Sequence, residues 1–204
     1  TKSADGGAIN YAAHAVAQLG MKVAVVTRLA KEDDRVVEKF AQAGIDCFVT
    51  YTPQSTLMKL EYPTTDPDIR TLTVTGTAGS VTAGDVEKID AKAAVIGSSL
   101  RGEVGMDVIQ KLKEKNMLVA ADMQGFVRVP VENDLIFQPW AAMVEGLECI
   151  TYLKVDKAEA EFLTGLSDLH EAAIKLHSLG PKEIVITQSS GVTVFAGGKF
   201  HTAP

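Results

Sequence analysis

The sequence predicts an α/β fold: a mostly parallel sheet with helices on both faces and a small antiparallel β lid. Short apolar runs rich in β-branched residues alternate with helical patterns along most of the 204 residues, which is typical of βαβ crossovers in a parallel sheet. The run at residues 22–27 is almost continuously apolar, as expected of a strand that is buried on both faces. One segment, residues 45–76, breaks the alternation.

The individual elements follow from the spacing of the apolar residues. Apolar positions at helical spacing predict helices. The predicted helices cover residues 11–19, 33–43, 103–116, 156–163 and 169–178. Apolar or β-branched runs predict strands at residues 22–27, 93–96, 117–121, 150–155 and 183–187. Residues 192–202 predict a hairpin that turns at Gly197-Gly198.

The exceptional segment contains three β-like stretches, residues 46–52, 56–62 and 69–75, with turns at residues 53–54 and 64–68. Met58, Leu60 and Tyr62 alternate with charged residues, so one face is apolar and the other is wet. This flap is either a lid over a pocket or an extra β layer and dimer surface, and the two are compatible. The chain then divides into a core of residues 1–44 and 77–204 and a lid insertion of residues 45–76.

Composition argues against two classes of partner. The 20 Lys and Arg against 26 Asp and Glu give a net charge of -6 without any basic block, which argues against a nucleic-acid surface. No apolar run reaches the roughly 20 residues that span a bilayer. Cys47 and Cys149 lack metal or disulfide spacing and fit buried thiols in a reducing cytosol, so a cytoplasmic protein is expected. Both ends of the sequence are expected to be truncated.

Candidate chemistry sits at the ends of the α/β units, where such folds place ligands. Gly6-Gly7 precedes the first helix. The two glycines either let a ligand approach the free N–H groups at the start of this helix or form only a turn. Asp156 and Glu159 open another helix and either form a capping box or face a hydrated Mg²⁺ ion. The turn after the strand at residues 183–187 either wraps phosphates or is a plain hairpin turn. No P-loop and no GxGxxG motif is present.

Three segments in order resemble the ribokinase-like (PfkB) carbohydrate kinases. They are residues 6–13 with Leu19-Gly20, residues 153–159 with 163–165, and residues 184–187 with Gly191-Val192. The likeness covers nearly the whole chain and includes the position of the β flap. It implies a ribokinase-like fold and a homodimer formed through the lid.

The resemblance also implies a function, which is transfer of the γ-phosphoryl group of ATP to a hydroxyl group of a sugar, a sugar phosphate or a nucleoside. Excluding water beneath a lid suits this chemistry, because ATP must not be hydrolysed. The implied substrate-binding residues are Gly6, Gly7, Asn10 and Tyr11. The implied nucleotide-binding residues are Asp156, Thr187, Ser189 and Gly191, and Glu159 is expected to act through Mg²⁺ and its water shell.

The sequence departs from the family pattern at three places. Tyr11 stands where the family usually has Asn, and Asn10 lies one position early. Asp156 replaces another usual Asn, so Mg²⁺, Lys154 or Lys157 is expected to compensate its charge. The family's Gly-Ala-Gly-Asp segment, which supplies the catalytic base, is absent, so no catalytic residue is assigned. The Tyr11 and Asp156 departures favour one alternative, a non-catalytic ligand-binding or scaffold relative. The missing glycine fingerprint and the β flap disfavour a generic Rossmann-type binding domain.

Overall fold

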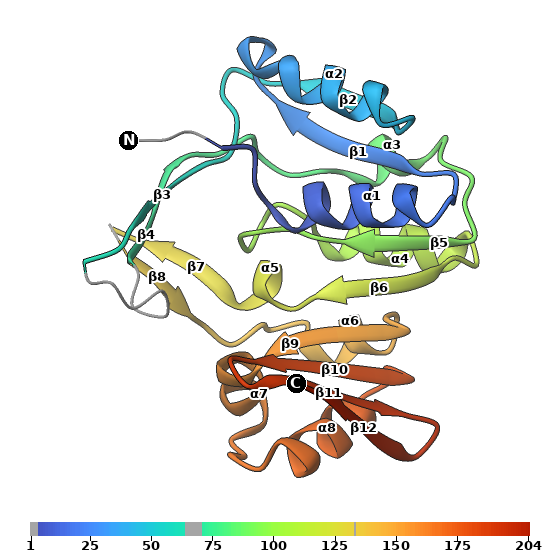
Figure 1. Cartoon of the computed structure of the whole chain (residues 1–204), viewed down its shortest axis with the longest axis vertical. Coiled ribbons are helices and arrows are strands. Elements are labelled where there is room, and N and C mark those ends of the chain that lie inside the picture. Colours follow the sequence, from blue (N-terminus) through green and yellow to red (C-terminus); the bar gives the residue numbers. More distant parts are fainter. Residues whose placement is uncertain (1–3, 64–70, 133) are drawn as a thin grey trace.

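The computed structural model describes residues 4–63, 71–132 and 134–204 (Figure 1). Its main sheet has six strands in the order β12-β11-β10-β9-β6-β5. Strands β5, β6, β9 and β10 run parallel, and β11 and β12 form an antiparallel hairpin at one side. The bounds are β5 (Ala93–Ile96), β6 (Leu118–Asp122), β9 (Tyr152–Asp156), β10 (Glu183–Gln188), β11 (Gly191–Ala196) and β12 (Lys199–Ala203). The mostly parallel sheet and the hairpin are therefore confirmed.

The predicted helices are present, and the described residues form four further short helices, of which η1 is a 3-10 helix. In chain order, the helices are α1 (Ala8–Gln18), η1 (Lys31–Asp33), α2 (Arg35–Gln42), α3 (Ala83–Val86), α4 (Met106–Glu114), α5 (Gln124–Val127), α6 (Met143–Leu147), α7 (Lys157–Thr164) and α8 (Leu169–His177). Helices α4, α7 and α8 contact the main sheet, and its inward-facing residues, such as Leu153, Val155 and Ile186, are fully buried. Their neighbours Tyr152 and Lys154 point to the opposite, partly exposed face, because successive strand residues alternate sides.

A second, two-stranded parallel sheet pairs β1 (Ala24–Leu29) with β2 (Asp46–Tyr51). Helix α1 lies between β1 and β5 (Figure 1), and Val25, Phe40 and Ile45 are buried in a small core of their own. The sequence predicts that residues 46–52 belong to the lid. Their pairing with β1 through helix α2 makes them part of a βαβ unit instead, so the antiparallel part begins later than residue 45.

The antiparallel layer consists of two ribbons. One pairs β3 (Leu57–Glu61) with β4 (Thr71–Gly76), as expected, although the predicted turn at residues 64–68 and the start of the stretch at residues 69–75 lie outside the described residues. The other ribbon, β7 (Arg128–Val131) with β8 (Asp134–Phe137), was not predicted. Strand β4 contacts β8, so the two ribbons lie side by side (Figure 1).

Among the helices of the described segments, none is long and apolar enough to cross a membrane. Cys47 and Cys149 are free thiols that are both partly buried. Burial raises the pKa of the Cys47 thiol above its ordinary value, which disfavours a reactive thiolate.

Candidate functional site

The carboxyl ends of the parallel strands form one edge of the main sheet. Strands β5, β6, β9 and β10 are consecutive neighbours, and strands in a sheet lie about 4.8 Å apart, so their ends span about 14 Å. Gly97 follows β5, Asp122 ends β6, Asp156 ends β9, and Thr187 lies opposite Asp156 in the register of β10. Ligands in open α/β sheets bind outside this edge, and we call it the carboxyl edge.

The start of α1 packs against this edge. A Cβ atom on Gly97 would lie 2.9 Å from the backbone nitrogen of Ile9 and 3.2 Å from the Cβ of Ala8, so glycine is needed for the helix to come this close. Gly7 is the N-cap with a φ of 88°, a conformation that favours glycine. Gly7 and Gly97 therefore allow the first N–H groups of α1 to lie beside the end of β5.

Asp156 and Glu159 form the predicted capping box at the start of α7. The Glu159 N–H donates to Asp156 Oδ1 at 2.8 Å, and the Asp156 N–H donates to Glu159 Oε2 at 2.8 Å. Glu159 is fully buried. Burial raises the pKa of its carboxyl group above the ordinary value, and the hydrogen bond from Asp156 and the charge of Arg128 offset only part of this effect.

Two cations accompany these carboxylates at the carboxyl edge. Arg128 Nη2 lies 3.3 Å from Asp156 Oδ2 and 3.0 Å from Glu159 Oε1. Lys154 Nζ lies 3.2 Å from Asp122 Oδ2 on the neighbouring strand. The charge of Asp156 is thus compensated by Arg128, and Lys154 pairs with Asp122 instead of Asp156. Sequence reasoning missed Arg128 because it lies 28 and 31 residues from its partners.

The third group of candidates lies in the β10–β11 hairpin. The Thr187 hydroxyl donates to the backbone oxygen of Val155 at 3.4 Å, and Gln188 pairs with Gly191, so Ser189 and Ser190 form a two-residue turn. A Cβ atom on Gly191 would lie 2.1 Å from the Ala203 backbone oxygen. Close strand packing therefore accounts for this glycine, which supports the plain-turn interpretation, and a hollow of about 240 Å³ lies beside Ser190 and Gly191.

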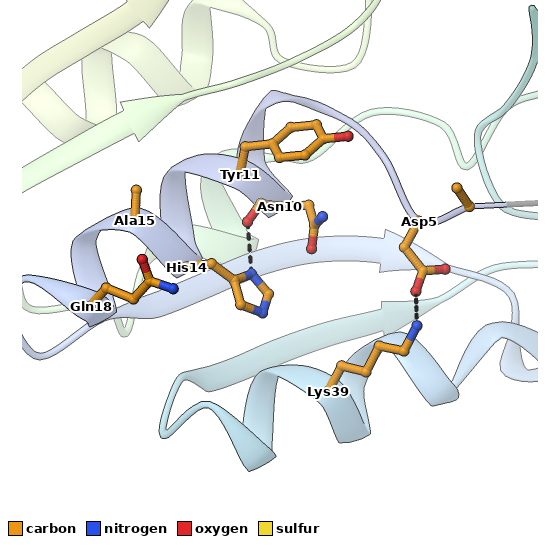
Figure 2. Close-up of a pocket in the computed structure, with 8 residues that line it drawn as sticks. Asp5, Asn10, Tyr11, His14, Ala15, Gln18 and Lys39 are labelled. Atoms are coloured by element: carbon orange, nitrogen blue, oxygen red, sulfur yellow. Dashed lines mark hydrogen bonds and ion pairs between the residues drawn. The ribbon is translucent and has the colours of Figure 1, made fainter.

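Asn10 and Tyr11 lie in a different environment from the carboxylates. Both line a cavity of about 530 Å³ between α1 and α2 (Figure 2). Asp5 in its wall forms ion pairs with Lys39 and Arg35, and the Asn10 backbone oxygen lies 2.8 Å from His14 Nδ1. The Tyr11 ring points away from His14 across α1 (Figure 2) and is 68% exposed. The cavity includes neither Asp156 nor Thr187.

A metal ion bound directly by Glu159 does not fit this arrangement. Each carboxylate oxygen of Glu159 already accepts a hydrogen bond, and the side chain has no exposed surface. Throughout residues 4–63, 71–132 and 134–204, no three His, Cys, Asp or Glu side chains gather closely enough to hold a metal. The more open Asp156 is the better candidate for contact through water, and the Mg²⁺ role of Glu159 stays a prediction.

Known structures share this architecture. The chain is similar to a pyrophosphate-dependent kinase in the ribokinase family complexed with a pyrophosphate analog and myo-inositol, with a TM-score of 0.90, 33% identity, and coverage of 99% of this chain and 71% of the other. A sulfate complex of a pyrophosphate-dependent kinase in the ribokinase family matches with a TM-score of 0.92, 34% identity, and coverage of 99% and 71%.

A more distant structure supports the fold alone. The Arabidopsis thaliana ribokinase complexed with ribose and ATP matches with a TM-score of 0.73, 19% identity, and coverage of 100% of this chain and 69% of the other. No curated protein matches the chain significantly. The profile of the pfkB family carbohydrate kinases matches residues 1–204. The predicted ribokinase-like fold is therefore confirmed, and the chain belongs to the pfkB family of carbohydrate kinases.

Proposed function

We propose that the protein is a phosphotransferase that moves a phosphoryl group from a polyphosphate donor to a hydroxyl group of a cyclic polyol. The observation that carries this proposal is the carboxyl edge, where a glycine-lined helix start, two cations and the Asp156–Glu159 pair occupy neighbouring strand ends. The span of about 14 Å from β5 to β10 is long enough for an acceptor and a donor side by side. Phosphoryl transfer needs mainly positioning and charge stabilisation, which such an edge can supply.

Each end of the edge takes one reactant in this proposal. Gly6, Gly7 and the N–H groups that open α1 bind the acceptor beside Gly97. Asp156, Thr187, Ser189 and Gly191 line the donor side. Asn10 and Tyr11 contact the acceptor from the first turn of α1, although the cavity that they line lies between α1 and α2.

We take pyrophosphate as the first donor and myo-inositol as the first acceptor to test. Relatives at 33–34% identity are named as pyrophosphate-dependent kinases, and one of them is complexed with myo-inositol. ATP, the donor that the sequence resemblance implies, is the second candidate, since the ribokinase that shares the fold binds it. The wider acceptor class comprises sugars, sugar phosphates and nucleosides.

A non-catalytic ligand-binding relative is the second candidate function. The Tyr11 and Asp156 departures from the family pattern favour it. Such a protein would bind a polyol or a phosphate at the same edge without transferring a phosphoryl group.

The test is phosphoryl transfer by the protein expressed from its complete gene. Pyrophosphate or ATP is supplied with and without Mg²⁺ in the presence of myo-inositol, ribose, fructose or a nucleoside, and the phosphorylated product is followed by ³¹P NMR. We expect a phosphate monoester of a polyol, formed only when Mg²⁺ is present. Binding of myo-inositol without any product from either donor would favour the non-catalytic alternative and contradict the proposal.

A further inference from the structure

Arg128 has a side chain that is only partly used by its protein contacts. One nitrogen, Nη2, makes both ion pairs, with Asp156 Oδ2 and with Glu159 Oε1. Within the described residues, neither Nε nor Nη1 has a hydrogen-bond partner, and the side chain is 20% exposed. Because guanidinium carries five N–H donors in a planar fork, three of them, one on Nε and two on Nη1, have no partner among the residues that the structure describes.

The backbone around Arg128 is fixed. Its carbonyl oxygen accepts a hydrogen bond from the N–H of Arg101 at 2.9 Å, and Arg101 Nε donates to the neighbouring Phe126 oxygen at 2.7 Å. Arg128 also begins β7, where it pairs with Phe137 of β8. The residue is thus held where the second ribbon leaves the main sheet, between the antiparallel layer and the end of β9.

We propose that Arg128 is a phosphate-binding residue of the donor subsite, anchored by Asp156 and Glu159 through Nη2 and binding a donor phosphate through Nη1 and Nε. The inference rests on the proposed function and names the residue that selects a phosphate-rich donor. It assigns Glu159 a positioning role, which is to orient the guanidinium from a fully buried site.

Charge and chemistry support this assignment. An arginine whose orientation is already fixed loses less side-chain entropy when it binds an anion. Charge-assisted hydrogen bonds to phosphate are among the stronger polar contacts in proteins. Lys154, the other cation of the edge, is a single ammonium group already paired with Asp122, so Arg128 offers the larger number of free donors.

The decisive variant is Arg128→Lys. Lysine keeps the positive charge near Asp156 and Glu159 but has no second nitrogen for the donor. Binding of inorganic pyrophosphate and of myo-inositol to the complete protein is measured by isothermal titration calorimetry. We expect R128K to bind pyrophosphate about tenfold or more weakly than wild type, with myo-inositol affinity within threefold and thermal stability retained. Arg128→Gln, which loses the charge as well, is expected to weaken pyrophosphate binding further.

Arg35→Gln is the matched control, since Arg35 is a half-exposed arginine on α2 that pairs with Asp33 and Asp5. It removes the same charge and is expected to leave pyrophosphate binding unchanged. Pyrophosphate binding by R128K at wild-type strength, an equal loss of both ligands, or no pyrophosphate binding by wild type would overturn the assignment. Wild type that binds pyrophosphate yet phosphorylates no acceptor would instead refute the proposed function, while the binding comparison still decides the role of Arg128.

Discussion

Asp156 and Glu159 hold each other by two reciprocal hydrogen bonds of 2.8 Å, each from the backbone N–H of one residue to the carboxylate of the other. This pair closes the first turn of α7 and also anchors Arg128. One motif therefore stabilises a helix start and arranges charge at the carboxyl edge, and substitutions can separate the two effects.

Asp156→Asn is expected to preserve the cap and alter the donor side. Asn caps helices as well as Asp does, whereas Ala at this position costs about 1 kcal/mol. We therefore expect Asp156→Asn to leave the free energy of unfolding nearly unchanged and Asp156→Ala to lower it by about 1 kcal/mol in urea unfolding. Asp156→Asn should also change KM for the donor or the metal preference. Unchanged donor kinetics would leave capping as the only role of Asp156.

Gly97→Ala is expected to weaken acceptor binding. The added Cβ would lie 2.9 Å from the Ile9 nitrogen, which is too close, so the start of α1 must move away from β5. We expect KM for the acceptor to rise about tenfold, because a misplacement near 1 Å can cost even more in a positioned site. Gly84→Ala, whose Cβ would meet only Thr82 Oγ1 at 3.6 Å, is the control. Equal acceptor KM values in the two variants would contradict the placement of the acceptor beside α1.

Thr56→Val is expected to loosen the β3–β4 ribbon. The Thr56 hydroxyl donates to Glu103 Oε1 at 2.8 Å and accepts from the Ala78 N–H at 3.1 Å, so it ties the base of the ribbon to the core. Losing these hydrogen bonds should lower the free energy of unfolding by about 1–3 kcal/mol. It should also speed amide hydrogen exchange in β3 and β4. Thr75→Val is the control, because the exposed Thr75 hydroxyl donates to the Leu57 backbone oxygen at a long 3.4 Å. It should change neither the free energy of unfolding nor the rate of exchange in the ribbon. Unchanged exchange in Thr56→Val would show that the ribbon is held by other contacts.

If two copies of the protein associate through the lid, exposed apolar side chains on the two ribbons should stabilise the dimer. Leu57, Leu60 and Ile136 are 51%, 48% and 41% exposed, and burying such side chains favours association. We expect the complete protein to sediment as a dimer and Leu60→Glu to shift it to a monomer in analytical ultracentrifugation. Leu19→Glu, at an exposed leucine after α1, should remain dimeric. A wild type that is monomeric at tens of micromolar would contradict this prediction.

Acid should remove a stabilising contact at Asp33. The hydrogen bond from Ser55 Oγ, and then Arg35, lower the pKa of Asp33 below its ordinary value of 3.8. A carboxyl with a lower pKa in the folded state stabilises the fold above the unfolded value, and this contribution is lost as the pH falls through the folded pKa. Asp33→Asn should therefore be about 1 kcal/mol less stable than wild type at pH 7, with a smaller difference below pH 3.8. Asp90→Asn, at an exposed position, is the control and should have nearly the wild-type free energy of unfolding at pH 7.

Local patterns predicted more of the fold than of the site. The parallel strands, the hairpin and the Asp156–Glu159 capping box follow from apolar spacing and from a motif of four residues, so a single segment carries each signal. The β7–β8 ribbon escaped prediction because its strands have four residues each and one contains Pro130, which is unusual inside a sheet. The contacts of Arg128 depend on the folded chain bringing three separate elements together.

The same reason explains the two corrections at the lid and at Asp156. Residues 46–51 have the β-branched composition of any strand, and only their partner β1 makes them part of a parallel unit. Lys154 and Lys157 are near Asp156 in sequence, yet the side chain of Lys154 points to the neighbouring strand and reaches Asp122. Sequence proximity therefore misled the choice of counter-ion, which is a long-range arginine.

The claim that donor and acceptor share the carboxyl edge is tested most directly by hydrogen exchange of the complete protein, measured with myo-inositol and with pyrophosphate. Myo-inositol should slow exchange at the start of α1 and after β5, and pyrophosphate should slow it at the ends of β9 and β10 and around Arg128. Protection that falls instead at the opposite ends of these strands, or only in the cavity between α1 and α2, would contradict the account.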